Sequence, residues 1–433
     1  MAILSQELVD YILDFLHTSV PSLSSSSLVC RAWLPTTRYH LFRTPVLYQV
    51  SLGRSPKDNT APFLRLLDLP LCTFRHTIQG CVLNIQREAV FRRCIDALAK
   101  HTTLNGTLLI AHWQSLGDIG LINDLQIPQR FSSIRSFAYS TLGDTWSSNL
   151  AQLIVSLPHL ESLSIFTNIR NDMRGTLPIH DQQQQVVLSK LTKLRLRMSN
   201  PSELLHWMLS LPGYTPRMET LDIVIYNNTS TGWGLVEALG PFLVANSNTL
   251  KYLSLGMQYN FDLQLPSGSE NKVIQSLEIG SLPNLRYLTL QTHDIDALCH
   301  TATRFLKSHP HALERLTLNL VPIISREWSY DETHTRLRLK ESFDRKYTSK
   351  VMLLYIHVLC PIRGHVPSDE DNLARAQNLL GDILPDWENM GKLTVRVVQG
   401  EQWQEDSLEK VNKTIWGSTN VPFTRVLTRI GTL

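Results

Sequence analysis

Histidine and cysteine are the residue types in this sequence that could ligate a metal or act as nucleophiles. The chain has 15 histidines and 6 cysteines, and the closest pairings are Cys299-His300 and His309-Pro310-His311. Neither pairing has the ligand spacing of a zinc site, and no second pair completes a set of four ligands. The sequence also lacks a serine nucleophile elbow, a phosphate-binding loop, a dinucleotide fingerprint and a zinc-protease helix. We therefore expect no enzyme activity, no metal and no cofactor.

Lys193, Arg195 and Arg197 form the densest cluster of basic residues at regular spacing. They alternate with leucines, so an extended strand would place all three cations on one face. No glycine-rich loop or interleaved aromatic residue accompanies them, which favours a solvated stripe over a phosphate site. The whole chain has 41 Lys plus Arg against 38 Asp plus Glu, a formal net charge of +3. This balance disfavours nucleic acid as a partner.

The sequence also disfavours membranes and secretion. Its longest apolar stretch is residues 351–360, well short of the roughly 20 apolar residues that span a bilayer. Glu7 and Asp10 lie where a signal peptide would be apolar. The cysteines are scattered without paired spacing, which is typical of reduced thiols inside the cell. We therefore expect a cytoplasmic or nuclear protein.

A recurring phrase indicates which elements position the polar residues. Leu-Pro-x-Leu-x-x-Leu-x-Leu occurs at residues 282–290, with Ile at the last position at residues 157–165 and a close variant at residues 309–318. Weaker copies keep only the pattern apolar-x-x-apolar-x-apolar. Counted from the first apolar residue of that pattern, the copies start near residues 78, 104, 134, 160, 191, 218, 250, 285, 313, 351 and 390.

Each copy predicts a strand followed by a helix. Two apolar residues separated by one residue lie on the same face of a strand. Between the strands, apolar residues recur with helical spacing, and the Leu-Pro step ends the helix because proline disfavours helical geometry in the residue before it. The helical stripes include Leu150/Leu153/Ile154/Leu157, Leu204/Leu205/Met208/Leu209 and Ile295/Leu298/Cys299/Ala302/Phe305/Leu306.

Such short units cannot bury their apolar faces alone, so they must stack on one another. Right-handed crossovers make the successive strands parallel. The sequence therefore predicts an α/β fold in which a solenoid carries parallel strands inside and helices outside. The register resembles the leucine-rich repeat family, in particular its irregular intracellular members, over about residues 75–400. The Asn or Cys that normally follows the second strand leucine by three places is absent from most copies.

The concave face of a solenoid is its usual binding surface, and Tyr and Arg are favoured at interface hot spots. The outward positions of the predicted strands therefore supply candidate residues for binding a protein substrate. For any single residue, the alternative is a solvated polar position without a partner. The candidates are Lys193, Arg195, Arg197, Tyr252, Tyr287, Gln291, Arg315 and Asn319.

The N-terminal residues have a different pattern. Leu8, Tyr11, Ile12 and Phe15 predict an amphipathic helix, and Ser24–Ser27 predict either a flexible linker or a short helix. With Leu-Ser-Gln-Glu-Leu at residues 4–8, Leu-Val-Cys-Arg-Ala-Trp at 28–33 and Leu-Phe-Arg-x-Pro-Val at 41–46, the segment resembles an F-box. Ser5 stands where that family usually has proline, and because serine is a good helix cap we expect the helix to start normally.

The resemblance implies a module at residues 1–48 that binds the Skp-type adaptor of a cullin–RING ubiquitin ligase. A solenoid at residues 49–400 and a C-terminal cap or tail at residues 401–433 would follow. The chain would then be a non-catalytic subunit that recruits a protein substrate. Two alternatives stay open: the helices could only cap the first repeat, which would bury Trp33, or the chain could be a scaffold that engages no ubiquitin ligase. By resemblance, the adaptor-binding residues are Leu4, Glu7, Leu8, Ile12, Leu28, Val29 and Trp33.

Overall fold

The chain forms two compact units. A computed structural model describes residues 5–16, 19–50, 57–85, 87–112, 126–141, 148–167, 188–198, 201–211, 216–227, 232–259, 282–292, 295–308, 313–320, 339–340, 343, 351–360, 384, 390 and 392–399. Among these, the residues up to Thr167 belong to the first unit and those from Leu188 onward to the second. The predicted tail at residues 401–433 and the candidate Leu4 lie outside the described residues.

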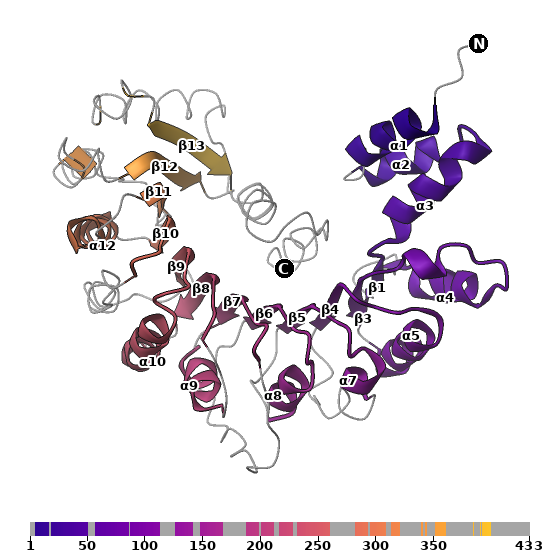
Figure 1. Ribbon diagram of the computed structural model, residues 1–433, viewed down its shortest axis with the longest axis horizontal. Helices are drawn as coiled ribbons and strands as arrows, with labels where there is room; N and C mark the ends of the chain where they lie inside the picture. Colours follow the sequence, from indigo (N-terminus) through magenta and orange to yellow (C-terminus); the bar gives the residue numbers. More distant parts are fainter. Residues whose placement is uncertain are drawn as a thin grey trace. The chain divides into compact units, whose positions relative to one another are not determined.

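The first unit begins with a small group of helices. These are α1 (Gln6–Phe15), α2 (Val20–Ser26), the short 3-10 helix η1 (Arg31–Trp33) and α3 (Leu34–Phe42) (Figure 1). As predicted, Ser5 caps α1, and its hydroxyl accepts a hydrogen bond from the backbone N–H of Leu8 at 3.4 Å. Most of the serine run lies in α2, so the short-helix alternative is correct. Val9, Leu13 and Leu23 are buried.

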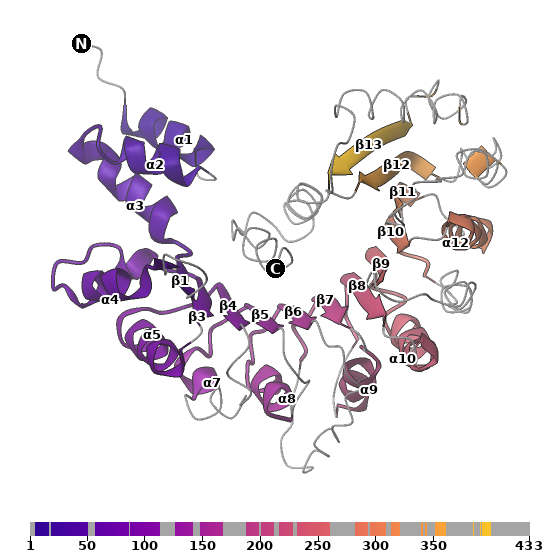
Figure 2. The same cartoon turned by 180° about the vertical axis from the view of Figure 1, so that it is seen from behind.

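The rest of the first unit is an α/β layer structure with the strand order β6-β5-β4-β3-β1-β2. Neighbouring strands run parallel except for the antiparallel pair β1 and β2. The helices lie along one side of β3 to β6 in both views (Figures 1 and 2). The strands are β1 (Val46–Val50), β2 (Lys57–Asp58), β3 (Cys81–Ile85), β4 (Thr107–His112), β5 (Ser136–Thr141) and β6 (Ser162–Thr167), and the helices are α4 (Thr60–Asp68), η2 (Arg75–Thr77), α5 (Glu88–His101), α7 (Ile127–Arg130) and α8 (Ser148–Val155).

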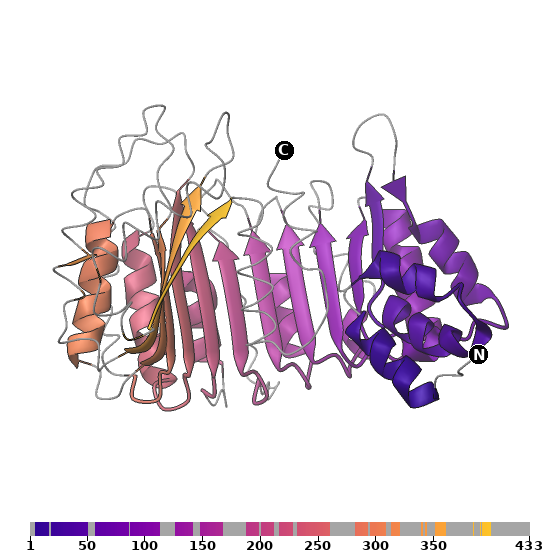
Figure 3. The same ribbon diagram turned by 90° about the horizontal axis from the view of Figure 1, so that it is seen from above.

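The second unit repeats the same alternation with strand order β13-β12-β11-β10-β9-β8-β7. All neighbours in it are parallel, and Figure 3 shows the strands side by side with one common direction. Its elements are β7 (Lys193–Met198), α9 (Ser202–Ser210), β8 (Thr220–Asn227), α10 (Gly232–Ala245), β9 (Tyr252–Tyr259), β10 (Tyr287–Thr292), α12 (Ile295–Ser308), β11 (Leu313–Leu320), β12 (Val351–Cys360) and β13 (Leu393–Gln399).

The predicted α/β class and parallel strands are confirmed. Each predicted repeat start lies at the first residue of a strand or at most three residues before it, including the less regular starts at 78, 104, 351 and 390. The predicted helical stripes lie on α8, α9 and α12. The sequence did not predict β1, which pairs in parallel with β3 and begins two residues before the predicted end of the N-terminal module at residue 48.

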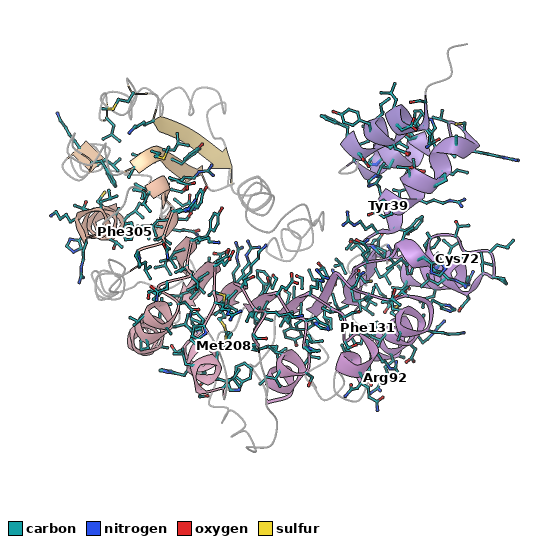
Figure 4. The ribbon with its side chains drawn as sticks, in the orientation of Figure 1. Tyr39, Cys72, Arg92, Phe131, Met208 and Phe305 are labelled. Carbon is teal, nitrogen blue, oxygen red and sulfur yellow. The ribbon has the colours of Figure 1, made fainter. Side chains whose placement is uncertain are left out.

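The core of each unit lies between its strands and its helices. In the second unit, Leu288 is the register partner of Leu316 and Leu290 that of Leu318, and all four are at most 1% exposed. In the first unit, Phe131 is buried between helices and strands, whereas Arg92 on α5 points away from the strands (Figure 4). The alternation of apolar and polar residues along each strand therefore decides which face meets the helices.

Two glycines allow the backbone to pass closely where β3 and β4 begin. The backbone N–H of Gly106 donates to the carbonyl oxygen of Gln79 at 2.8 Å. A Cβ atom added to Gly80 would lie 2.6 Å from the carbonyl oxygen of Thr107, and one added to Gly106 would lie 2.9 Å from that of Gln79. A side chain at either position would force these two strands apart.

We expect Gly80→Ala to lower the free energy of unfolding by about 1–3 kcal/mol, because the added methyl group meets backbone atoms that cannot rotate away. Asn105→Ala is the control, since Asn105 is exposed in the turn that precedes the neighbouring strand β4. Urea unfolding followed by far-ultraviolet circular dichroism measures both effects. Equal midpoints for the two variants would contradict the close approach at Gly80.

Candidate protein-docking surfaces

The polar side of α1 faces α3. Asp10 accepts hydrogen bonds from the hydroxyl of Thr36 on α3 at 2.5 Å and from Nε2 of Gln6 at 2.8 Å, and these donors lower the pKa of its carboxyl group. One turn further on, Nε2 of His40 lies 2.8 Å from the carboxylate of Asp14. Residues 6, 10 and 14 lie on one side of a helix, so these contacts fix the rotation of α1 about its axis.

This rotation turns most of the apolar stripe of α1 outward. Leu8 is 46% exposed, Tyr11 65% and Phe15 78%, and the rings of Tyr11 and Phe15 lie 6.3 Å apart between centroids. In the turn that precedes η1, Leu28 is 86% exposed and Val29 61%. Large apolar side chains gathered on one element and left in water are typical of a surface that binds another protein.

The predicted adaptor-binding residues are therefore placed as follows. Glu7, Leu8, Leu28 and Val29 are exposed, and Ile12 and Trp33 are partly buried. Trp33 alone does not separate the docking interpretation from the capping alternative, because it is neither fully buried nor fully exposed. The exposure of Leu8 and Leu28 favours the docking interpretation, because a helical group that served only as a cap would bury these side chains.

The helical group also contacts the segment that leads into β3, and it does so through the end of α3. The rings of Phe42 and Phe74 stack with centroids 4.0 Å apart. Nε of Arg43 donates to Oε1 of Gln79 at 2.7 Å, and the backbone oxygen of Arg43 accepts from the N–H of Gln79 at 2.8 Å. The group is thus anchored on one side, and this anchoring leaves the apolar side of α1 uncovered.

The second surface is the face of β7 to β12 that lies opposite the helices of the second unit. Strand pairing aligns its polar side chains in rows. One row contains Tyr252, Tyr287 and Arg315, which are register partners on β9, β10 and β11. The other two rows contain Arg195, Asp222, Ser254, Thr289 and Thr317, and Arg197, Val224, Gly256, Gln291 and Asn319. All eight predicted substrate-binding residues lie on this face.

The interpretation of the basic cluster as a solvated stripe is wrong for Arg195. Its side chain is 4% exposed and its Nε donates to Oδ2 of Asp222 at 2.9 Å. Burial lowers the pKa of Arg195 to about 10, against the opposing effect of the Asp222 carboxylate. Lys193 and Arg197 are partly exposed. The sequence contains both partners of the ion pair, but 27 residues separate them, so only the strand register brings them together.

Tyrosine and arginine side chains form a ladder across β9 to β12. The rings of Tyr252 and Tyr287 stack with centroids 4.2 Å apart and planes 7° apart. The guanidinium of Arg315 lies 6.0 Å from the ring centroid of Tyr287 and 4.8 Å from that of Tyr355. Sequence reasoning missed Tyr355, although it lies between Leu354 and Ile356 of a predicted repeat, the position that Thr317 occupies in the repeat before it.

Glu314 holds the hydroxyl group of Tyr287, the middle ring of this ladder. Its carboxylate accepts a hydrogen bond from the hydroxyl of Tyr287, which raises the pKa of that hydroxyl. The same carboxylate pairs with Arg286 at 3.0 Å. The carboxylate of Glu314 therefore already has two partners within the fold, Tyr287 and Arg286. The guanidinium of Arg315 lies over the rings of Tyr287 and Tyr355.

The cysteine thiols of the described residues have no environment that would activate them. Cys81, Cys94 and Cys299 are buried free thiols, and burial raises the pKa of Cys94 to about 12, which keeps that thiol protonated and unreactive. Across the described ranges, no three His, Cys, Asp or Glu side chains are grouped so that they could hold a metal ion. No helix in the described part of the chain is both long and apolar enough to cross a membrane.

Comparisons with known proteins neither support nor oppose either surface. The sequence matches no protein-family model, and no curated protein matches it. The interpretation of both surfaces therefore depends on the geometry and chemistry described above.

We expect Asp222→Ala to lower the free energy of unfolding by about 3–5 kcal/mol, because it leaves the buried guanidinium of Arg195 without its counter-charge. Glu219→Ala is the matched control: Glu219 pairs with Lys251 at 3.0 Å, but both side chains are nearly half exposed. An exposed pair contributes about 0–1 kcal/mol. Urea unfolding of the two variants compares them, and similar losses would show that Arg195 and Asp222 are not an isolated buried pair.

Proposed function

We propose that this protein is a non-catalytic adaptor that recruits a protein substrate to a cullin–RING ubiquitin ligase. In this proposal the helical group at residues 5–42 binds the Skp-type adaptor of the ligase. The outward face of the parallel strands binds the substrate. The protein would itself break no bond, and it would raise the rate of ubiquitin transfer by holding substrate and ligase together.

One observation carries the proposal: the apolar side of α1 and the Leu28-Val29 turn face away from the interior of their own helical group. Polar bonds from Asp10 and Asp14 to α3 hold α1 in this orientation. Exposed leucine, tyrosine and phenylalanine side chains lose contact with water when a partner covers them, which favours binding by roughly 25 cal/mol per Å² of apolar area. The residues concerned include Leu8, Leu28 and Val29, which the F-box resemblance assigns to adaptor binding.

The strand face supports the second half of the proposal. It presents tyrosine and arginine, the residue types enriched where binding energy is concentrated. These residue types support the assignment of the strand face to protein binding.

The test is co-expression of the full chain with a Skp-type adaptor, followed by affinity purification of the chain. We expect the wild type to retain the adaptor and Leu28→Asp to lose it at least tenfold, because a carboxylate at the centre of an apolar contact must be desolvated. Leu8→Asp should act in the same direction. Leu71→Asp is the matched control, since Leu71 is 90% exposed and follows α4, outside the helical group.

Two outcomes would count against the proposal. If the wild type does not co-purify with the adaptor, the ligase interpretation fails and a repeat scaffold that engages no ubiquitin ligase is favoured. If Leu28→Asp and Leu8→Asp both keep the adaptor, the binding surface has been assigned to the wrong residues. Circular dichroism of each variant separates lost binding from lost folding.

A further inference from the structure

The strand face of the second unit carries more positive than negative charge. At the outward positions of β7 to β11, the described side chains include four cations, Lys193, Arg195, Arg197 and Arg315, and one carboxylate, Asp222. Asp222 is already paired with Arg195. Arg315 is a further cation of this face, and its Nε has no hydrogen-bond partner among the described residues. A partner with carboxylate groups complements this local excess.

The middle ring of the aromatic ladder, that of Tyr287, has a neighbour on each of its two faces. Tyr287 has the ring of Tyr252 on one side, at 4.2 Å between centroids, and the guanidinium of Arg315 on the other, at 6.0 Å. Arg315 also covers Tyr355. Bases of single-stranded nucleic acid bind largely by stacking on open aromatic faces, and Tyr287 offers none. The ladder instead holds the Arg315 guanidinium in place, which reduces the entropy lost when that group binds an anion.

Beside the ladder, two buried amide side chains have unused hydrogen-bonding groups. Gln291 is 5% exposed and Asn319 6%, and the two residues are register partners on β10 and β11. Among the described residues, Nε2 of Gln291 and Oδ1 of Asn319 have no hydrogen-bond partner, and neither has Nε of Arg315. Buried polar atoms are nearly always satisfied. A donor and an acceptor side by side match the C=O and N–H groups of a peptide backbone.

From these three observations we infer that the outward face of the second unit binds an extended acidic segment of a protein. A carboxylate of the segment contacts Arg315, and a peptide group of its backbone contacts Gln291 and Asn319, which lie on the neighbouring strands β10 and β11. The inference deepens the proposed function, because it names the chemistry of the substrate segment.

In the first experiment, a phage library that displays random 12-residue peptides is selected for binding to the purified full chain. We expect the enriched peptides to be richer in Asp and Glu than the starting library. The most enriched peptide is then synthesised with a fluorophore and titrated by fluorescence anisotropy. Arg315→Met, which keeps a chain of similar length without the charge, should weaken its binding about tenfold or more, as expected for a charge-assisted contact.

Arg304→Met is the matched control. Arg304 is exposed on α12, in the helix layer of the same unit, so this variant loses the same charge from the other side of the sheet. It should bind the peptide as the wild type does. If the two variants weaken binding equally, the charge acts only over long range and the assigned contact is wrong.

If Arg315→Met folds poorly, a second variant still tests the inference. Gln291→Leu removes a buried amide whose nitrogen has no partner among the described residues, so the urea midpoint should stay equal or rise. Peptide affinity should nevertheless fall about fivefold or more. A residue with a purely structural role would not combine unchanged stability with weaker binding, so unchanged affinity would overturn the assignment of Gln291.

Three further results would overturn the inference. The first is a selection that yields no enriched peptide, and the second is a set of enriched peptides without an excess of Asp and Glu. The third is binding of a labelled 12-nucleotide oligouridylate that is tighter than peptide binding and is lost in Arg315→Met. The last result would identify the face as a nucleic-acid surface. None of these assays contains the Skp-type adaptor. Failure of adaptor co-purification with successful peptide binding would therefore reject the ligase role alone, and the reverse pattern would reject only the acidic segment.

Discussion

The structure depends on one constraint: the two apolar side chains of each repeat strand can be buried only beneath the neighbouring strands and the helices of the same unit. Leu288 and Leu290 lie beside Leu316 and Leu318 in strict register, and a slip of one residue would turn all of them into water. Burial therefore fixes the pairing of the strands. Because side chains alternate along a strand, the same pairing fixes the position of every polar residue on the opposite face.

Strand spacing also explains how polar residues become buried on a face without an apolar core. Neighbouring strands lie about 4.8 Å apart, which is close to the 4.2 Å between the stacked rings of Tyr252 and Tyr287. Side chains in one row therefore shield one another from water, and Arg195 is 3% exposed although it points away from the helices. A charge in that position is stable because Asp222 is next to it. Gln291 lies beside Asn319 in the strand register, but its Nε2 has no hydrogen-bond partner among the described residues.

Sequence patterns predicted the fold well where a short-range rule governs it. The apolar repeat located each of the described strands from β3 to β13, and the serine at position 5 located the start of α1, because alternation and capping involve residues only two or three positions apart. The strand β1 was missed because it follows the helical group without a copy of the repeat. The burial of Arg195 and the place of Tyr355 in the ladder were missed because both depend on which strands lie side by side. For α1, the apolar stripe was recognised, but its outward direction depends on Asp10 and Thr36, which are 26 residues apart.

In the proposed adaptor, the two candidate surfaces would bind their partners through different forces, and this difference would have a functional consequence. Contact through Leu8, Leu28 and Val29 depends on burial of apolar area, which salt in the physiological range changes little. Contact through Arg315 depends on charge. Salt screens this attraction over about 8 Å at physiological ionic strength, and the attraction acts chiefly on the rate of association. A protein with both surfaces could keep one partner bound through the apolar surface while it exchanges a second, acidic partner rapidly. That division suits an adaptor, since one ligase must meet many substrate molecules in turn.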